Sequence, residues 1–422
     1  MSTEPVHELV DHLFRHESGR MVASLTRVFG PANLDTVEEV VQEALLRALD
    51  TWAYHGVPRN PPAWLHTVAR RRALDVLRRE RRFSEIAGKM APLLEGEDAP
   101  GVDAIESRAG GEPADDRLRL IFTCCHPDVP ADARVAITLK TVCGFGVAEI
   151  ARAFLVRKSA IAQRLVRAKR LIRERRIPYE VPAGPELAGR LDTVLEVLTL
   201  MFNEGYCAYE GEEAISADLC HEAIRLAGLL AADRATDAPQ VHALLAFLLF
   251  QAARLPARLD GAGDIVLLGE QDRGAWDRAM IDRGVNHLRR AMAATRLGPY
   301  HLQAGIAACH AAANGESDTD WSYILGLYEL LMRIRPSPVV ALNRGVAVAM
   351  AHGPEAGLEA LDRIKDEPSL ADYHFLPASR GELYLRCGMR DAAAASFRDA
   401  LALARNAAQR RLLIRKLAAC SG

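Results

Sequence analysis

The sequence predicts an all-α protein built from several helical domains. The chain has 422 residues, half of them hydrophobic, which is enough for two to four domains with cores of their own. The hydrophobic residues are mostly Ala, Leu, Val and Ile at helical spacing, and alternating strand patterns are scarce. Charge is also uneven along the chain, although the net charge is only −2. The first half carries basic blocks and the segment after residue 180 is rich in carboxylates, which indicates domains with different partners.

The first 83 residues predict amphipathic helices, one with an acidic polar face and another with a basic polar face. In LDTVEEVVQEALLRALDTW (residues 34–52) the apolar side chains share one face, and the acidic and polar residues should be exposed on the other. These exposed residues are Glu38, Glu39, Gln42 and Glu43. Gly and Pro then end the helix within AYHGVPRNPP.

A basic helix is predicted for WLHTVARRRALDVLRRERR (residues 64–82). A basic helix beside an aromatic residue and a Pro-rich loop suits single-stranded or melting DNA, although Trp64 alone would more often be a core residue. Its candidate DNA-contacting residues are Trp64, Arg70, Arg71, Arg72, Arg78 and Arg79, with Asp75 among the few carboxylates between them.

The second basic block, residues 148–176, predicts a helix-turn-helix. It holds ten Arg or Lys residues against two carboxylates, Glu149 and Glu174. A solvated helix face would show more carboxylates at i+4, so nucleic acid is the better interpretation. A short helix, a turn and a longer basic helix match the geometry that enters a major groove. The candidate residues are Arg157, Lys158, Ser159, Ala160, Gln163, Arg164 and Arg167, with Lys169 and Arg170 also placed for phosphate contacts.

Residues 179–422 predict a helical extension with tetratricopeptide-like pairs. The spacing of small and aromatic residues in 378–404 fits one such repeat, and residues 341–364 fit it less well. The residues that carry the repeat pattern are Gly381, Tyr384, Gly388, Ala393, Phe397 and Ala400. Because one helix pair cannot bury its own apolar face, further pairs are expected between residues 185 and 340.

At these residues the sequence resembles a family. DTVEEVVQEALLRALDTW with PAWLHTVARRRALDVLRRERR is similar to the second conserved region of bacterial extracytoplasmic-function sigma factors, and AEIARAFLVRKSAIAQRLVRAKRLI is similar to their fourth region. The resemblance covers residues 5–178, and the rear half resembles the long extension of one subgroup. It implies domains at 1–83 (region 2), 84–114 (linker), 115–178 (region 4) and 179–422 (extension).

The resemblance also implies partners and residue roles. Glu38, Glu39, Gln42 and Glu43 match the helix that docks on the clamp of core RNA polymerase. The basic block at 64–82 matches the segment that recognises and opens the minus-ten element, and the helix after Arg157 matches the reader of the minus-thirty-five element. Four residues depart from the common pattern and leave the promoter sequence open: Arg71, Leu155, Ala160 and Gln163.

No enzymatic centre, metal site or cofactor is predicted. The adjacent Cys124, Cys125 and His126 cannot easily face one tetrahedral ion, and MFNEGYCAYEGEEAI carries carboxylates without an accompanying catalytic motif. No run is long and apolar enough to span a membrane, so a cytosolic protein is expected. The leading prediction is a sigma factor whose extension responds to a small-molecule or protein regulator. The alternative is a helix-turn-helix regulator with a tetratricopeptide effector domain that binds DNA without polymerase.

Overall fold

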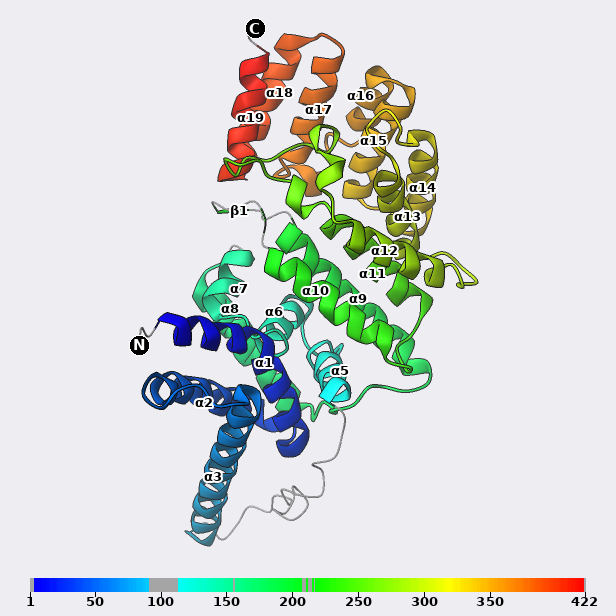
Figure 1. Ribbon diagram of the computed structural model, residues 1–422. Helices are drawn as coiled ribbons and strands as arrows, with labels where there is room; N and C mark the ends of the chain where they lie inside the picture. Colours follow the sequence, from blue (N-terminus) through cyan, green and yellow to red (C-terminus); the bar gives the residue numbers. More distant parts are fainter. Residues whose placement is uncertain are drawn as a thin grey trace. The chain divides into compact units, whose positions relative to one another are not determined.

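The structure, a computed structural model, describes residues 4–90, 113–154, 156–206, 210–211, 215 and 217–420, with backbone alone for 4–16, 77, 80–90, 113–115, 152–153 and 210–211. The chain forms two compact units, Met1–Val197 and Leu198–Gly422. Helices dominate both units, so the predicted all-α class is confirmed (Figure 1). Over the described residues, no helix is long and apolar enough to cross a membrane.

The first unit consists of helices joined by short turns. Its elements are α1 (Glu4–Phe29), η1 (Pro31–Asn33), α2 (Leu34–His55), α3 (Pro61–Met90), α5 (Pro113–Cys124), α6 (Ala131–Thr141), α7 (Val147–Ala153), α8 (Lys158–Glu174) and the first part of α9 (Pro185–Tyr206). Helix α1 packs on α2, α3 and α5, while α8 packs on α6, α7 and η1. The two predicted DNA-facing blocks therefore belong to one compact unit.

Local sequence explains where these helices end. Gly56 follows α2 with φ of 79°, a backbone angle that favours glycine, and Pro61 and Pro62 open α3, where a missing N–H costs nothing. Trp52 is buried and its ring lies 5.4 Å, edge-on, from that of Trp64. This aromatic contact fixes the start of α3 against the end of α2.

The second unit is a series of helix pairs. Its elements are the end of α9, β1 (Glu210–Gly211), α10 (Ala217–Ala232), α11 (Pro239–Ala252), η2 (Leu255–Ala257), η3 (Leu268–Glu270), η4 (Arg273–Ala275), α12 (Arg278–Ala291), α13 (Pro299–Ala312), α14 (Trp321–Ile334), α15 (Pro338–His352), α16 (Pro354–Asp362), η5 (Pro368–Leu370), α17 (Phe375–Arg386), α18 (Arg390–Leu403), β2 (Arg405–Asn406) and α19 (Ala407–Ala419). From α13 to α19 each helix packs on the next along the chain (Figure 1).

The residues of the predicted repeat lie at the contact between α17 and α18. A Cβ at Gly381 would lie 2.7 Å from the Phe397 ring, so only glycine lets the two helices approach this closely. Gly388, with φ of 74°, makes the turn between them. Gly345 and Leu361 repeat the close approach between α15 and α16. The helix pairs form as expected, and their assignment to the tetratricopeptide class stays a prediction.

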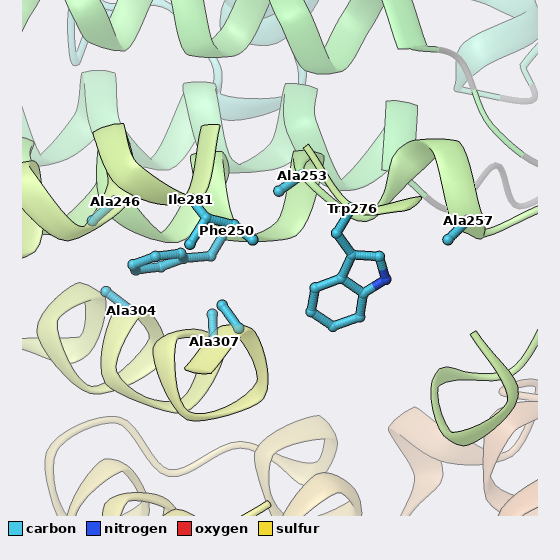
Figure 2. Packing of buried hydrophobic residues seen from close by; sticks show 9 residues of the cluster. Ala246, Phe250, Ala253, Ala257, Trp276, Ile281, Ala304 and Ala307 are labelled. Atoms are coloured by element: carbon cyan, nitrogen blue, oxygen red, sulfur yellow. The ribbon is translucent and has the colours of Figure 1, made fainter. Parts of the chain in front are cut away.

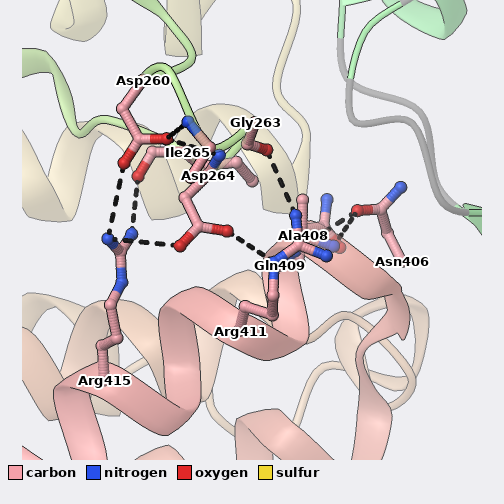
Figure 3. A network of polar contacts seen from close by, with 10 residues as sticks. Asp260, Gly263, Asp264, Ile265, Asn406, Ala408, Gln409, Arg411 and Arg415 are labelled. Carbon is pink, nitrogen blue, oxygen red and sulfur yellow. Dashed lines mark hydrogen bonds and ion pairs between the residues drawn. The ribbon is translucent and has the colours of Figure 1, made fainter.

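Two connections close the second unit on itself. Strands β1 and β2 pair in parallel, with Glu210 opposite Arg405 and Gly211 opposite Asn406. The last helix, α19, also binds the loop after η2: Arg411 contacts Asp264, and Arg415 contacts Asp264 and Asp260 (Figure 3). The end of the chain is thus tied to a segment about 150 residues earlier.

The predicted domain boundaries stay predictions. Helix α3 continues to Met90, beyond residue 84 where the linker is expected to begin, and α5 starts at Pro113. Residues 91–112 of the expected linker lie outside the described residues. The division between the two units falls inside α9, at Val197.

Candidate nucleic-acid interface

Helices α7 and α8 form the predicted pair, with α8 turning one face inward. Ile161, Leu165, Ala168 and Ile172 are buried at intervals of three and four residues, as an amphipathic helix requires. The other face carries the candidate contacts. Arg157, Lys158, Ser159, Gln163 and Arg167 are exposed, and Ala160 and Arg164 are partly buried. Leu155, in the predicted turn, lies outside the described residues.

Two arginines of this face share one carboxylate. Arg164 Nε lies 3.1 Å from Asp132 Oδ2, and Arg167 Nη2 lies 3.2 Å from Asp132 Oδ1. Asp132 is in the first turn of α6 and about half exposed. Solvent-accessible ion pairs of this kind are weak, so a DNA phosphate could displace Asp132 from both arginines.

Lys169 of α8 makes a different, largely buried contact with α2. Its Nζ lies 2.6 Å from Glu38 Oε2 and 2.9 Å from Asp35 Oδ1. Burial disfavours the charged ammonium, but Glu38 and Asp35 outweigh this effect and raise the pKa of Lys169. Glu38 is only 7% exposed. The expectation that Glu38 belongs to the exposed face of its helix is therefore wrong, because η1 and α8 pack over this end of α2.

The rest of the predicted acidic face is accessible and reaches the basic helix. Glu39 and Gln42 are exposed. Glu43, partly buried, lies 2.5 Å from Arg72 Nε. This hydrogen bond lowers the pKa of the Glu43 carboxyl and raises that of the Arg72 guanidinium. Glu43, a candidate polymerase contact, and Arg72, a candidate DNA contact, thus form an ion pair with each other.

Helix α3 presents its basic residues to solvent. Trp64 is partly buried against Trp52, so the ring supports the helix as well as bordering the basic face. The exposed residues are Arg70, Arg71, Arg72, Asp75, Arg78 and Arg79. They extend over more than two turns of one helix, a length of about 14 Å at 1.5 Å per residue, which suits contacts to several successive phosphates.

Buried contacts join the first helix of the unit to α5. Arg27 Nε lies 2.9 Å from Oδ2 of the buried Asp116. The Tyr179 hydroxyl lies 2.7 Å from the Ala23 carbonyl and 2.8 Å from that of Asp116. Sequence patterns did not reveal these residues or the role of Lys169, because their partners lie 63 to 156 residues away.

The cysteines beside this interface behave as core residues. Cys124 and Cys125 are fully buried and contact Thr141 and Thr138. Burial raises the pKa of both thiols, that of Cys125 to about 11, so neither is a ready thiolate ligand. Within the part of the chain that the structure describes, no three His, Cys, Asp or Glu residues are grouped to hold a metal ion.

Comparisons with known proteins agree with this geometry. The family model "Sigma-70 region 2" matches residues 13–83, and "Sigma-70, region 4" matches residues 119–172. An uncharacterized protein of Rhizobium meliloti (strain 1021) is 42% identical over 388 residues, 92% of this chain and 90% of that protein. The chain belongs to the sigma-70 family of sigma factors. It is of the extracytoplasmic-function type and carries a C-terminal extension, of which residues 190–292 match a family of unknown function (DUF6596).

Because the chain carries sigma-70 regions 2 and 4, it functions in promoter recognition. The partners that these regions imply are core RNA polymerase and promoter DNA. Sigma factors are not enzymes. In this sigma factor, region 2 begins within α1, contains α2 and ends within α3, and region 4 begins within α5 and ends near the last turn of α8.

Proposed function

We propose that this sigma factor docks on core RNA polymerase through α2, opens the minus-ten element with α3 and reads the minus-thirty-five element with α8. One observation carries the proposal: a single compact unit presents an acidic helix and two basic helices, each of which overlaps a matched sigma region. Opposite charges on different helices allow one molecule to contact both a protein partner and DNA.

The docking surface consists of Glu39, Gln42 and Glu43. Glu38 becomes part of this surface only when its ion pair with Lys169 is broken. Glu39 and Gln42 are open to solvent, whereas Glu38 is occupied by Lys169 and Glu43 by Arg72. Lys169 is on the helix proposed to read DNA. Polymerase docking and minus-thirty-five recognition are therefore coupled, because full exposure of Glu38 requires α8 to separate from α2.

The two DNA contacts differ in kind. The opened strand is proposed to bind along the exposed face of α3, where charge and stacking bind without strong sequence readout. The residues of this face are Trp64, Arg70, Arg71, Arg72, Asp75, Arg78 and Arg79. On α8, Gln163 and Arg164 are placed to hydrogen-bond base edges. Arg157, Lys158, Ser159, Ala160 and Arg167 surround them for backbone and methyl contacts.

Run-off transcription with bacterial core RNA polymerase tests this function. Initiation on promoter fragments from the source genome should require the protein and fail for Glu39→Lys, because charge reversal removes an exposed docking carboxylate. Asp50→Lys, equally exposed on the same helix, is the matched control and should initiate normally. Tight binding of duplex DNA by the protein alone, with no stimulation of polymerase, would instead indicate the conventional regulator.

The C-terminal extension is proposed to modulate this activity in response to a small-molecule or protein regulator. What supports this is charge asymmetry: the segment 186–222 is acidic, opposite in sign to α3 and α8. A chain ending after Val197 is the appropriate truncation, because the buried Arg190 of α9 donates a hydrogen bond to the Phe122 carbonyl within the first unit. If that chain with polymerase binds promoter DNA no better than the full chain, masking by the extension is untenable.

A further inference from the structure

The second unit contains an arginine cluster that makes no direct ion pair with a carboxylate among the described residues. We define the cluster as Arg254, Arg258 and Arg273 together with the rings of Trp276 and Tyr206. Arg254 Cζ lies 5.5 Å and Arg273 Cζ 5.2 Å from the Trp276 ring centre, and Arg258 Cζ lies 3.8 Å from that of Tyr206. The cluster is built from the end of α9, the turn after α11 and the irregular segment that holds η4.

The hydrogen bonds of these arginines go to neutral groups. Arg254 donates to the side-chain oxygens of Gln251 and Gln271. Arg258 donates to the Tyr206 carbonyl, and Arg273 to the carbonyls of His310 and Ala313 and the Thr319 hydroxyl.

Other arginines of the same unit are paired with acids. Arg344 contacts Glu329, Arg380 contacts Asp362, and Arg411 contacts Asp264. Among the described residues, no carboxylate lies within ion-pair distance of Arg254, Arg258 or Arg273. Burial, and then the neighbouring Arg258 and Arg273, lower the pKa of Arg254. Glu316 and Asp318 favour the charged form of Arg273, but from beyond ion-pair distance. Partly buried like charges that are not paired directly with counter-ions are costly, so an anion bound among these arginines would be stabilised.

Polar atoms without partners lie beside these charges. Trp276 is 3% exposed, yet its indole Nε1 has no hydrogen-bond acceptor among the described residues, and the buried Tyr206 hydroxyl and His310 Nδ1 also lack partners there. Figure 2 shows the indole nitrogen on the side of the ring that faces Ala257, next to Arg258 in the chain, and away from Phe250. Buried donors are normally satisfied. A bound molecule with hydrogen-bond acceptor atoms would give these groups their partners.

We propose that the arginine cluster is a binding site for a small anion with a phosphate or carboxylate group. The planar guanidinium of Arg254, with donors left after its two glutamine contacts, fits such oxygens in a fork. Trp276 Nε1–H and the Tyr206 hydroxyl would donate to the same group. His310 would accept or donate at Nδ1, since burial, Arg254 and Arg273 lower its pKa to about 4 and keep it neutral.

Calorimetric titration of the full chain in chloride buffer at pH 7.5 tests the site, with inorganic phosphate and succinate as the two probes. At least one probe should bind saturably, with a Kd of about 1 mM or tighter, and the tighter probe identifies the ligand group. Arg254→Gln and Arg258→Gln should each weaken binding about tenfold or more. Arg398→Gln removes the same charge from an exposed position on α18 and should bind as the wild type does.

Two further variants keep the test decisive if an arginine variant does not fold. Arg254→Lys keeps the charge but loses the fork, and Trp276→Phe keeps the ring but loses the N–H; both should weaken binding. The proposal is overturned if the wild type binds neither probe, or if Arg254→Gln and Arg398→Gln bind equally. The inference goes beyond the proposed function and does not rest on it. The titration contains no polymerase or DNA, so its failure and a failure of run-off transcription are distinguishable.

Discussion

Lys169 links α8 to α2 through its ion pairs with Glu38 and Asp35. Its ammonium is the partner of Glu38 Oε2, while Glu38 Oε1 is buried and has no hydrogen-bond partner in the described part of the chain. The Glu38 carboxylate is therefore stabilised mainly by one cation, and removing one member of a buried pair is costlier than removing both.

Lys169→Met should lower the free energy of unfolding by about 1–3 kcal/mol, because it leaves Glu38 buried without its cation. Urea denaturation at pH 7 measures the change. Lys158→Met, at an exposed position on the same helix, is the control and should alter stability little. Adding Glu38→Gln to Lys169→Met should restore part of the loss; a double variant with the full sum of both losses would contradict the pairing.

Glu204, the carboxyl of the MFNEGY segment (residues 201–206), should make stability depend on pH. Burial raises its pKa to about 7 from 4.5. The folded state therefore holds a proton that the unfolded state releases between these values, and Glu204 destabilises the fold as pH rises through this range. Glu204→Gln mimics the protonated form. It should raise Tm at pH 8 and leave it nearly unchanged at pH 4, below both pKa values; equal effects at both pH values would rule out a raised pKa.

At the scale of elements, glycine decides how closely the helix pairs of the extension approach. A Cβ at Gly381 meets the Phe397 ring, whereas one at Gly326 in α14 meets nothing within 4 Å. Gly381→Ala should therefore lower stability by about 1–3 kcal/mol through overpacking. Gly326→Ala should raise it by about 0.5–1 kcal/mol, the usual gain in helix propensity. Thermal unfolding compares the two, and a gain in both would mean that α17 can move away from α18 without cost.

Elements were predictable where the signal is local. The helical period of Ile161, Leu165 and Ala168 predicts the buried face of α8, and Gly381 with Phe397 predicts a close helix pair. Contacts between distant segments were not predictable. Glu38 looked exposed because its helix alone shows an acidic face, and its contact with Lys169, 131 residues later, could not be read from the local pattern. The arginine cluster was missed for a related reason: it lies where helical periodicity stops, between α11 and α12.

At the scale of the whole chain, the closure of the second unit bears on the arginine cluster. Arg258 opens a small loop in which Leu259 pairs with Ile265 and the Val266 amide donates to the Arg258 carbonyl. The tip of this loop is bound from outside by α19, since Arg411 donates to the Gly263 carbonyl and Arg415 to that of Ile265 (Figure 3). The last helix therefore stabilises the segment that begins with an anion-binding arginine.

Replacing Arg411 and Arg415 by Gln should loosen this loop without unfolding the unit. Each contact joins a half-exposed arginine to the partly buried Asp264 and is confined to one loop, so amide hydrogen exchange is a better measure than Tm. Exchange at Ala262, Asp264 and Val266 should accelerate about tenfold, and phosphate or succinate should bind more weakly because Arg258 loses its fixed position. The control replaces Arg390 and Arg398, both exposed on α18, and should change neither. Unchanged exchange in the first variant would show that the loop is rigid by itself and that α19 does not support the site.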